Sequence, residues 1–154
     1  RTVERDADRS EDVWSITGET AVLERIARLA REAERTVLYG GPDLADPDPD
    51  LLAAFESVCG RGVSVGLLVA GDDTVDPAWH DLDCVREYRV PAENRNEYAE
   101  RVLIVDFDVF LLSIRGGPTA DETAVWSAHT TFARVFSQLI AGSLPDLDGD
   151  GLAG

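Results

Sequence analysis

Two charged residues flank an apolar stretch, and their side chains could either bind a ligand or hold the fold together. Arg101 precedes Val102-Leu103-Ile104-Val105, and Asp106 follows that run. Residues five apart on an unbroken strand point to opposite faces of the sheet. In a structural interpretation, Asp106 accepts hydrogen bonds from turn amides and Arg101 pairs with an acid. In a functional interpretation, both residues belong to a ligand pocket, and the spacing leaves both interpretations open.

Small and polar residues lie where two strands are expected to end. Gly40 and Gly41 follow an apolar run, and open α/β sheets bind ligands beyond such strand ends, although a plain turn also uses glycines. Ser113 and Arg115 close a second apolar run. The Arg115 guanidinium could bind an anionic or polyhydroxyl ligand, or it could pair at the surface with the acids at 121 and 122.

Aromatic residues offer a further possible contact. Trp126 and Trp14 could stack on the face of a sugar, or they could pack in the core or in an interface. The predicted ligand-binding residues are therefore Gly40, Gly41, Ser113, Arg115 and Trp126.

The sequence shows no catalytic constellation of familiar spacing. His80 and His129 are the two histidines, and neither belongs to a recognisable Ser-His-Asp or Cys-His pattern. A Gly-x-x-x-x-Gly-Lys phosphate loop needs a lysine, and the chain has none. We therefore expect no enzymatic activity, no catalytic residue, no metal site and no cofactor.

The two cysteines do not have the spacing of a metal cluster. Cys59 lies on the apolar side of a predicted helix, and Cys84 lies at the start of a predicted strand. We expect both to be buried, reduced thiols, as in an intracellular protein.

Apolar periodicity predicts an α/β domain with a mixed sheet flanked by helices. Asp48 is expected to cap the second helix, with Pro49 at its first position. Alternation of helix and strand early in the chain implies parallel pairing, and the tight turn at 106–108 implies an antiparallel hairpin. Helices are expected at 20–34, 49–59 and 129–140, and strands at 36–39, 62–69, 85–90, 101–105, 109–114 and 123–126. The last helix is expected to bury Phe132, Val135, Phe136, Leu139 and Ile140.

Charge is the most unusual property of the composition. The chain of 154 residues carries 30 acidic and 14 basic side chains, for a net charge of -16, and every basic residue apart from histidine is arginine. Molar salt would screen this self-repulsion, so we interpret the acidity as a halophilic adaptation. The same charge opposes binding to DNA phosphates, so we expect no DNA binding by these residues alone. The sequence contains no 18-residue apolar run, so we expect no membrane interaction.

Four segments together resemble the TrmB family of archaeal transcriptional regulators. These segments are Val13 to Gly18, Cys59 to Val65, Ala99 to Asp106 with Leu111-Leu112-Ser113, and Glu122 to Ser127. The third resembles the phospholipase D motif His-x-Lys-x-x-x-x-Asp, but Ala99 stands at the His position and Arg101 at the Lys position. The Gly-Ser-x-Asn element that follows in phospholipase D enzymes is also lost, with Leu112-Ser113-Ile114-Arg115 as its nearest counterpart.

The resemblance implies a phospholipase D-like effector domain with a degenerate catalytic motif. We expect residues 1–12 to be a linker from a missing N-terminal DNA-binding domain, 13–144 to be the effector domain and 145–154 to be an acidic tail. The tail opens like a calcium-binding loop but lacks the later acidic ligand.

The expected function is effector sensing and dimerisation in a haloarchaeal, cytoplasmic regulator. A homodimer would bind a small metabolite or sugar, and DNA only through a winged-helix domain outside this chain. The hairpin and the last helix are the expected interface. Two alternatives are a phosphodiesterase with an atypical nucleophile and a ligand-free structural dimerisation module.

Overall fold

A mixed sheet forms the centre of the computed structural model, which describes residues 12–91, 99–116, 120–142 and 144. Seven strands of the described residues follow the order β1-β7-β6-β5-β2-β3-β4. The β2-β3 and β3-β4 pairs are parallel, whereas the pairs involving β5, β6, β7 and β1 are antiparallel. The strands are β1 (Trp14–Thr17), β2 (Thr36–Gly40), β3 (Ser64–Ala70), β4 (Val85–Val90), β5 (Ala99–Val105), β6 (Val109–Ile114) and β7 (Thr123–Ala128).

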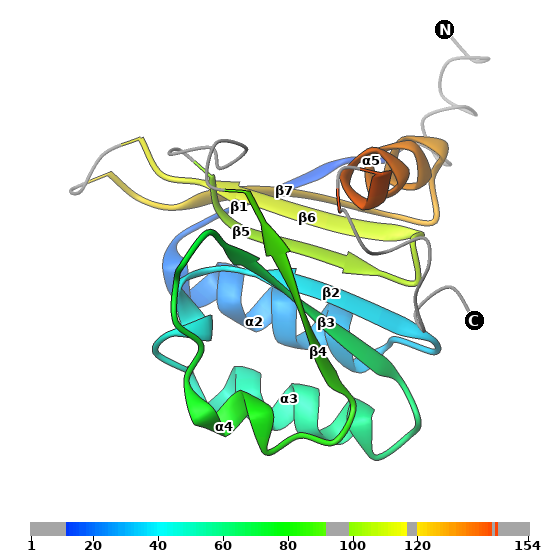
Figure 1. Cartoon of the computed structure of the whole chain (residues 1–154). Helices are drawn as coiled ribbons and strands as arrows, with labels where there is room; N and C mark the ends of the chain where they lie inside the picture. Colours follow the sequence, from blue (N-terminus) through cyan, green and yellow to red (C-terminus); the bar gives the residue numbers. More distant parts are fainter. Residues whose placement is uncertain (1–11, 92–98, 117–119, 143, 145–154) are drawn as a thin grey trace, which may run out of the picture.

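Helices cover the two faces of the sheet unequally. Helices α2 (Glu19–Arg31), α3 (Pro49–Cys59) and the short α4 (Pro77–His80) lie on one side, and α5 (Thr131–Gly142) lies on the other (Figure 1). A 3-10 helix, η1 (Pro42–Leu44), follows β2. The predicted α/β architecture is thus confirmed.

Local sequence explains where α3 begins. The Asp48 carboxylate accepts a hydrogen bond from the Leu51 amide at 3.0 Å, and Pro49 occupies the first turn. A carboxylate at this position satisfies an amide that has no partner inside the helix. The sequence did not predict two elements. One is β1, which is only four residues long, and the other is α4, whose last two residues belong to a segment, 79–83, that was expected to be irregular.

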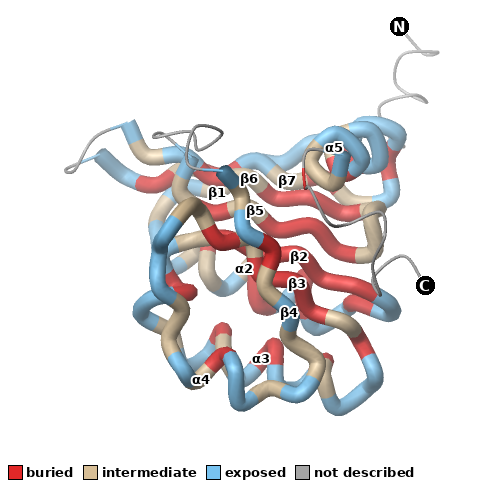
Figure 2. Tube along the Cα trace, in the orientation of Figure 1, coloured by how far each residue is buried: buried red, intermediate tan, exposed pale blue. Residues whose placement is uncertain are grey.

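The larger core lies between the sheet and α2 and α3. Burial is strongest along the central strands, which are red in Figure 2. The fully buried aromatics Tyr39, Phe55 and Trp79 pack edge to face, with successive ring centroids 5.6 Å and 5.3 Å apart. A smaller cluster, which includes Leu38, Tyr88 and Ile104, lies on the opposite face of the sheet.

The prediction for the last helix is wrong at three of its five core positions. Phe132, Val135 and Leu139 are exposed, at 49%, 48% and 69% of their surface. The helix instead buries the small residues Ala133 and Ser137 against the sheet. The periodicity located the stripe of large apolar side chains correctly. It could not show that the stripe of small residues, Ala133 and Ser137, is the one that packs against the sheet.

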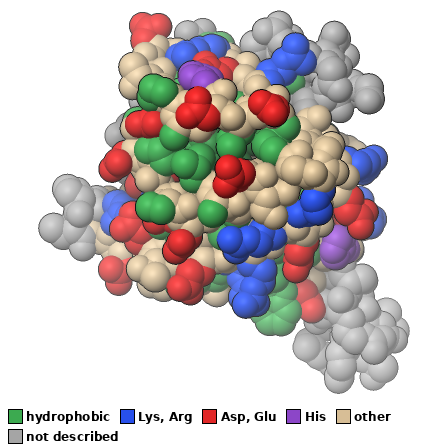
Figure 3. All heavy atoms as spheres, turned by 90° about the horizontal axis from the view of Figure 1, so that it is seen from below, with side chains coloured by type: hydrophobic (Ala, Val, Ile, Leu, Met, Phe, Trp, Pro, Cys, Tyr) green, Lys and Arg blue, Asp and Glu red, His purple; other side chains and the backbone are tan. Residues whose placement is uncertain are grey.

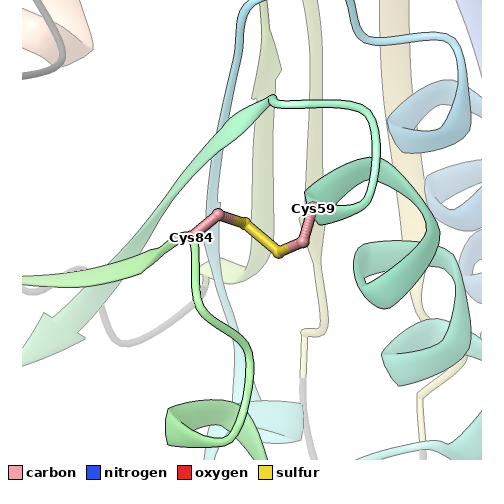
Figure 4. Close-up of a disulfide and its surroundings, with 2 residues drawn as sticks. All are labelled: Cys59 and Cys84. Atoms are coloured by element: carbon pink, nitrogen blue, oxygen red, sulfur yellow. A yellow bond between two sulfur atoms is a disulfide. The ribbon is translucent and has the colours of Figure 1, made fainter.

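The expectation of reduced thiols is also wrong. Cys59 and Cys84 form a disulfide that joins the end of α3 to the residue before β4 (Figure 4). Their Cα atoms lie 5.4 Å apart, within the usual range for a disulfide. The two residues are 25 positions apart in the chain, and the sequence alone did not show that α3 and β4 meet. The inference from reduced thiols to an intracellular protein therefore no longer applies.

We expect loss of this disulfide to lower the free energy of unfolding by about 3 kcal/mol, because it closes a loop of 25 residues in the unfolded chain. Urea denaturation with and without a reductant measures the difference. The Cys59→Ser/Cys84→Ser double variant should match the reduced protein and should no longer respond to reductant. A reductant effect of the same size in the double variant would contradict this explanation.

Parts of the predicted domain organisation lie outside the described residues. These are the linker apart from residue 12, and the acidic tail from 145 to 154. Within the residues that the structure describes, no helix has both the length and the apolar character needed to span a membrane.

Candidate functional site

Arg101 lies at the centre of a buried ionic network at the end of the sheet where β2 finishes. Its side chain is 2% exposed, and its Nε donates to Asp43 Oδ1 at 2.7 Å. Its Nη1 donates to Glu122, which is fully buried, and its Nη2 lies 3.3 Å from the exposed Glu19. The Tyr39 hydroxyl donates to the same Asp43 oxygen at 2.5 Å. We call Arg101, Asp43, Glu122, Ser113 and Tyr39 the buried arginine network.

Ser113 links the network to the neighbouring strand. Its hydroxyl donates to Glu122 Oε2 at 2.5 Å and accepts the Arg101 backbone amide at 2.9 Å. Arg115 stands at the rim, 26% exposed, with Nη2 3.5 Å from Glu122 Oε1 and Nε 3.8 Å from Glu100. Arg115 thus pairs with Glu122, one of the two acids that the sequence offered, but Glu122 is buried and not at the surface.

The network holds its charge despite burial. Burial opposes the Arg101 charge, but hydrogen bonds with Asp43 and Glu122 outweigh that effect and raise the pKa of Arg101. Burial, followed by the negative charge of Asp43, raises the pKa of the Tyr39 hydroxyl well above its usual value. The group therefore comprises a permanent cation, two buried acids and a neutral phenol.

The predicted ligand-binding residues do not form one group. Ser113 belongs to the network, Arg115 lies at its rim, and Gly41 packs against it: a Cβ at Gly41 would lie 2.9 Å from both Arg101 Cγ and the Tyr39 hydroxyl. At Gly40 a Cβ would meet the Leu68 carbonyl oxygen at 2.9 Å, so both glycines allow close packing. Trp126 lies further along β7, stacked on Trp14 with ring centroids 6.3 Å apart.

Asp106 has the structural role that the sequence offered as one alternative. Its carboxylate accepts the backbone amides of Glu34, Arg35 and Thr36 at 3.0, 2.8 and 2.9 Å. It therefore fixes the chain entering β2 to the turn after β5. Arg101 and Asp106 work at opposite ends of β5 and do not share a pocket, so the structural interpretation is confirmed for both.

A groove of about 540 Å³ lies at the Asp106 end of the sheet. The His129 Nδ1 lies 2.5 Å from Asp108 Oδ2, and Arg134 Nε donates to Asp108 Oδ1 at 2.8 Å. Three lining residues, Asp106, Phe107 and His129, have φ values of 54°, 55° and 62°. Such left-handed conformations are uncommon outside glycine and concentrate at functional sites. None of the five predicted ligand-binding residues lines this groove.

We expect Asp108 to make stability depend on acidity. Its burial raises the pKa, but hydrogen bonds from His129 and Arg134 prevail and lower it from 3.8. The hydrogen bonds of ionised Asp108 contribute about 1 kcal/mol to the free energy of unfolding. This contribution is present above the pKa of Asp108 in the unfolded chain and is lost as pH falls through its pKa in the folded protein. In urea denaturation, the gap between wild type and Asp108→Asn should shrink below pH 3.8. The exposed Asp83→Asn is the control, and a gap that is constant with pH would contradict the assignment.

Comparison with known proteins gives structural matches only: no family model matches the sequence, and no curated protein does. The phospholipase D family member Nuc from Salmonella typhimurium matches with a TM-score of 0.57 and 13% identity, covering 87% of this chain and 97% of Nuc. The chain has a phospholipase D-like fold. Its mixed sheet and flanking helices are those of the fold predicted from the sequence.

Two further solved structures match most of this chain. TrmBL2, an archaeal chromatin protein with a novel mode of DNA binding, matches with a TM-score of 0.60 and 14% identity. The alignment covers 86% of this chain and 53% of TrmBL2. Polyphosphate kinase from Porphyromonas gingivalis matches with a TM-score of 0.61 and 15% identity, covering 91% of this chain and 26% of the kinase.

The expectation that this chain is not an enzyme is corrected by these matches. Enzymes match this fold: polyphosphate kinase does, and so does phosphatidylserine synthase from Haemophilus influenzae, with a TM-score of 0.56 and 12% identity over 86% of this chain and 39% of the synthase. The fold therefore gives no ground for excluding enzymatic activity. The absence of His at position 99 removes one nucleophile, but it does not exclude activity at another position.

Sequence reasoning missed Asp43, Glu122 and Tyr39 as partners of Arg101. Asp43 and Glu122 are separated from it by 58 and 21 positions, so no local motif connects them. One signal was present: Arg101, Leu103 and Val105 are alternate residues of β5, so their side chains lie on the same face of the sheet, and Leu103 and Val105 are buried. A buried arginine needs a carboxylate partner. The alternation along β5 therefore predicts that Arg101 has a buried acidic partner, but it does not say which acid.

Proposed function

We propose that this chain is the ligand-sensing, dimerising domain of a transcriptional regulator that resembles the TrmB family. The observation that carries this proposal is the position of Arg115. It is the partly exposed cation at the rim of the buried arginine network, and it shares the Glu122 carboxylate with Arg101. An anionic or polyhydroxyl metabolite bound at Arg115 would compete directly with Glu122 for its hydrogen bonds.

The network provides a route from such a ligand into the fold. Glu122 precedes β7, Arg101 lies in β5, Ser113 in β6 and Asp43 in η1, so four separate elements meet in one set of hydrogen bonds. A change in the Arg115–Glu122 contact alters the charge balance around Arg101. Ligand affinity that differs between two arrangements of these elements would shift their populations.

Any contact with DNA belongs to a further domain of the proposed regulator. The net charge of -16 opposes association with phosphates, and Figure 3 shows acidic side chains spread over the face seen from below, with arginines among them. TrmBL2 shares this fold over about half of its own length. We propose a cytoplasmic homodimer that reaches DNA through a winged-helix domain, with the acidic surface adapted to high salt.

Thermal denaturation in the presence of sugars and sugar phosphates tests the sensing function. A probe at one hundred times its Kd should stabilise the wild type by about 2.7 kcal/mol. Arg115→Ala should abolish the shift, whereas Arg28→Ala, which removes an exposed arginine of α2, should keep it. An equal shift in Arg115→Ala, or no shift with any probe of the panel, would reject the proposal.

Phosphodiester hydrolysis is a second candidate function, favoured by the His129–Asp108 pair in the groove. Asp108 binds Nδ1, so Nε2 is the nitrogen that could attack phosphorus or accept a proton from water. Hydrolysis of bis(p-nitrophenyl) phosphate should then be lost in His129→Ala. His80→Ala is a matched control, because His80 also pairs with a carboxylate, that of Glu87. Wild-type protein that hydrolyses no more than buffer would dismiss this candidate.

A further inference from the structure

The outward face of α5 is the most apolar helical surface that the structure exposes. Phe132, Val135 and Leu139 occupy positions i, i+3 and i+7, so they form one stripe along the helix. We call these three residues the α5 stripe. By contrast, exposed positions of α2 carry charged side chains such as Glu24 and Arg28. Apolar surface gathered in this way is characteristic of an interaction site.

The helix is attached to the sheet by its buried residues and by one residue of the α5 stripe, Phe132, whose ring meets that of Phe110 edge to face with centroids 5.5 Å apart. Ala133 and Ser137 are buried, and the Ser137 hydroxyl donates to the Ala133 carbonyl oxygen at 2.7 Å. Phe136 packs on Phe110 of β6 with ring centroids 4.3 Å apart. Because these contacts already hold α5 in place, burial of Val135 and Leu139 is not needed for its docking.

Two apolar strand residues are also exposed on the sheet face that bears α5. Ile114 is 50% exposed and has the same strand phase as Phe110, which faces α5. Val125, 39% exposed, pairs in register with Leu112, which also has that phase. Strands β6 and β7 thus expose apolar residues on the sheet face that bears α5, opposite α2 and α3, and Figure 1 shows α5 on that side.

The charge of the segments around the α5 stripe indicates which kind of partner would bind there. About one residue in five of the whole chain is acidic, yet Thr131–Gly142 contains no acid and one arginine, Arg134. Strands β6 and β7 contain no charged residue. Two copies of a chain with charge -16 repel one another through their acidic surfaces, so a contact through these segments, which carry no acid, brings together few like charges.

We infer that the α5 stripe joins two copies of this chain about a two-fold axis. This inference rests on the homodimer in the proposed function and specifies its interface. Val135 lies near the middle of the stripe, so an antiparallel crossing of the two helices places Phe132 of one copy beside Leu139 of the other. Such a contact is self-complementary, as a two-fold interface requires.

Sedimentation equilibrium of charge variants tests the surface. Wild type should sediment with the mass of two chains, and Leu139→Glu should sediment as one chain with unchanged circular dichroism. Gln138→Glu adds the same charge to the neighbouring exposed position of α5 and should remain dimeric. A monomeric wild type, or a dimeric Leu139→Glu, would overturn the inference.

Cysteine cross-linking locates the axis independently of stability. The native cysteines are joined to one another, so a single added thiol is a specific probe. Val135→Cys should form a covalent dimer at least ten times faster than Gln138→Cys, and equal rates would overturn the inference. Thermal shifts with the sugar phosphates are measured on the same samples. A wild-type monomer that still responds to ligand contradicts only the interface, whereas a cross-linked dimer without any ligand response contradicts only the sensing function.

Discussion

Replacement of Arg101 by methionine should lower the free energy of unfolding by about 3–5 kcal/mol. The variant keeps a long side chain but leaves Asp43 and Glu122, 6% and 0% exposed, without their main cationic partner. Breaking one half of a buried ion pair costs more than the pair itself contributes, because the remaining charge stays out of water. Urea denaturation followed by circular dichroism measures the loss.

A second substitution separates lost charge pairing from lost packing. The double variant Arg101→Met/Glu122→Gln removes one of the two carboxylates left without Arg101, so it should recover a substantial part of the stability lost in Arg101→Met. Arg28→Ala, at an exposed site of α2, should change stability by no more than about 0.5 kcal/mol. A double variant that is less stable than Arg101→Met would show that the network is not held together by these charges.

Replacement of Asp106 by alanine should lower the free energy of unfolding by about 2–4 kcal/mol. The three amides of residues 34–36 lose their carboxylate acceptor. In addition, φ at position 106 is 54°, a conformation that alanine adopts poorly. Hydrogen exchange at the Arg35 and Thr36 amides should accelerate more than exchange in α3, which lies away from the turn.

Two further variants at this position distinguish the causes. Asp106→Asn keeps a side-chain oxygen acceptor and tolerates a left-handed backbone, so it should lose only about 1 kcal/mol. Asp106→Gly loses the acceptor but adopts positive φ easily, so it should fall between the asparagine and alanine variants. Equal stability of all three variants would contradict a hydrogen-bonding role for the carboxylate.

The sequence predicted the parts of the fold that depend on neighbouring residues. The Asp48 cap, the 106–108 turn and the apolar strands depend on residues within a few positions of one another, and each was located correctly. The spacing of the two motif residues predicted opposite faces of the strand but left their roles open. A period of two along β5 separates Arg101 from Asp106, and the structure places them at its two ends.

Features that depend on distant contacts were not predictable. The disulfide requires α3 and β4 to meet, and the network requires η1 and the segment before β7 to converge on β5. For α5, the sequence shows an apolar stripe, but which stripe faces the sheet depends on the fit of Ala133 and Ser137 against it. In each case the missing information concerns three-dimensional packing, which a single sequence states only indirectly.

Nuclear magnetic resonance of the arginine side chains tests the central claim most directly: Arg101 is a buried structural cation, and Arg115 faces ligand. In ¹⁵N-labelled protein, the Arg101 Nε proton should exchange slowly with water, because it is bound to Asp43 in a side chain that is 2% exposed. Addition of a sugar phosphate that raises the melting temperature should shift the Arg115 signal, with a smaller change at Arg101. Fast exchange at Arg101, together with a larger ligand-induced shift there than at Arg115, would contradict the account.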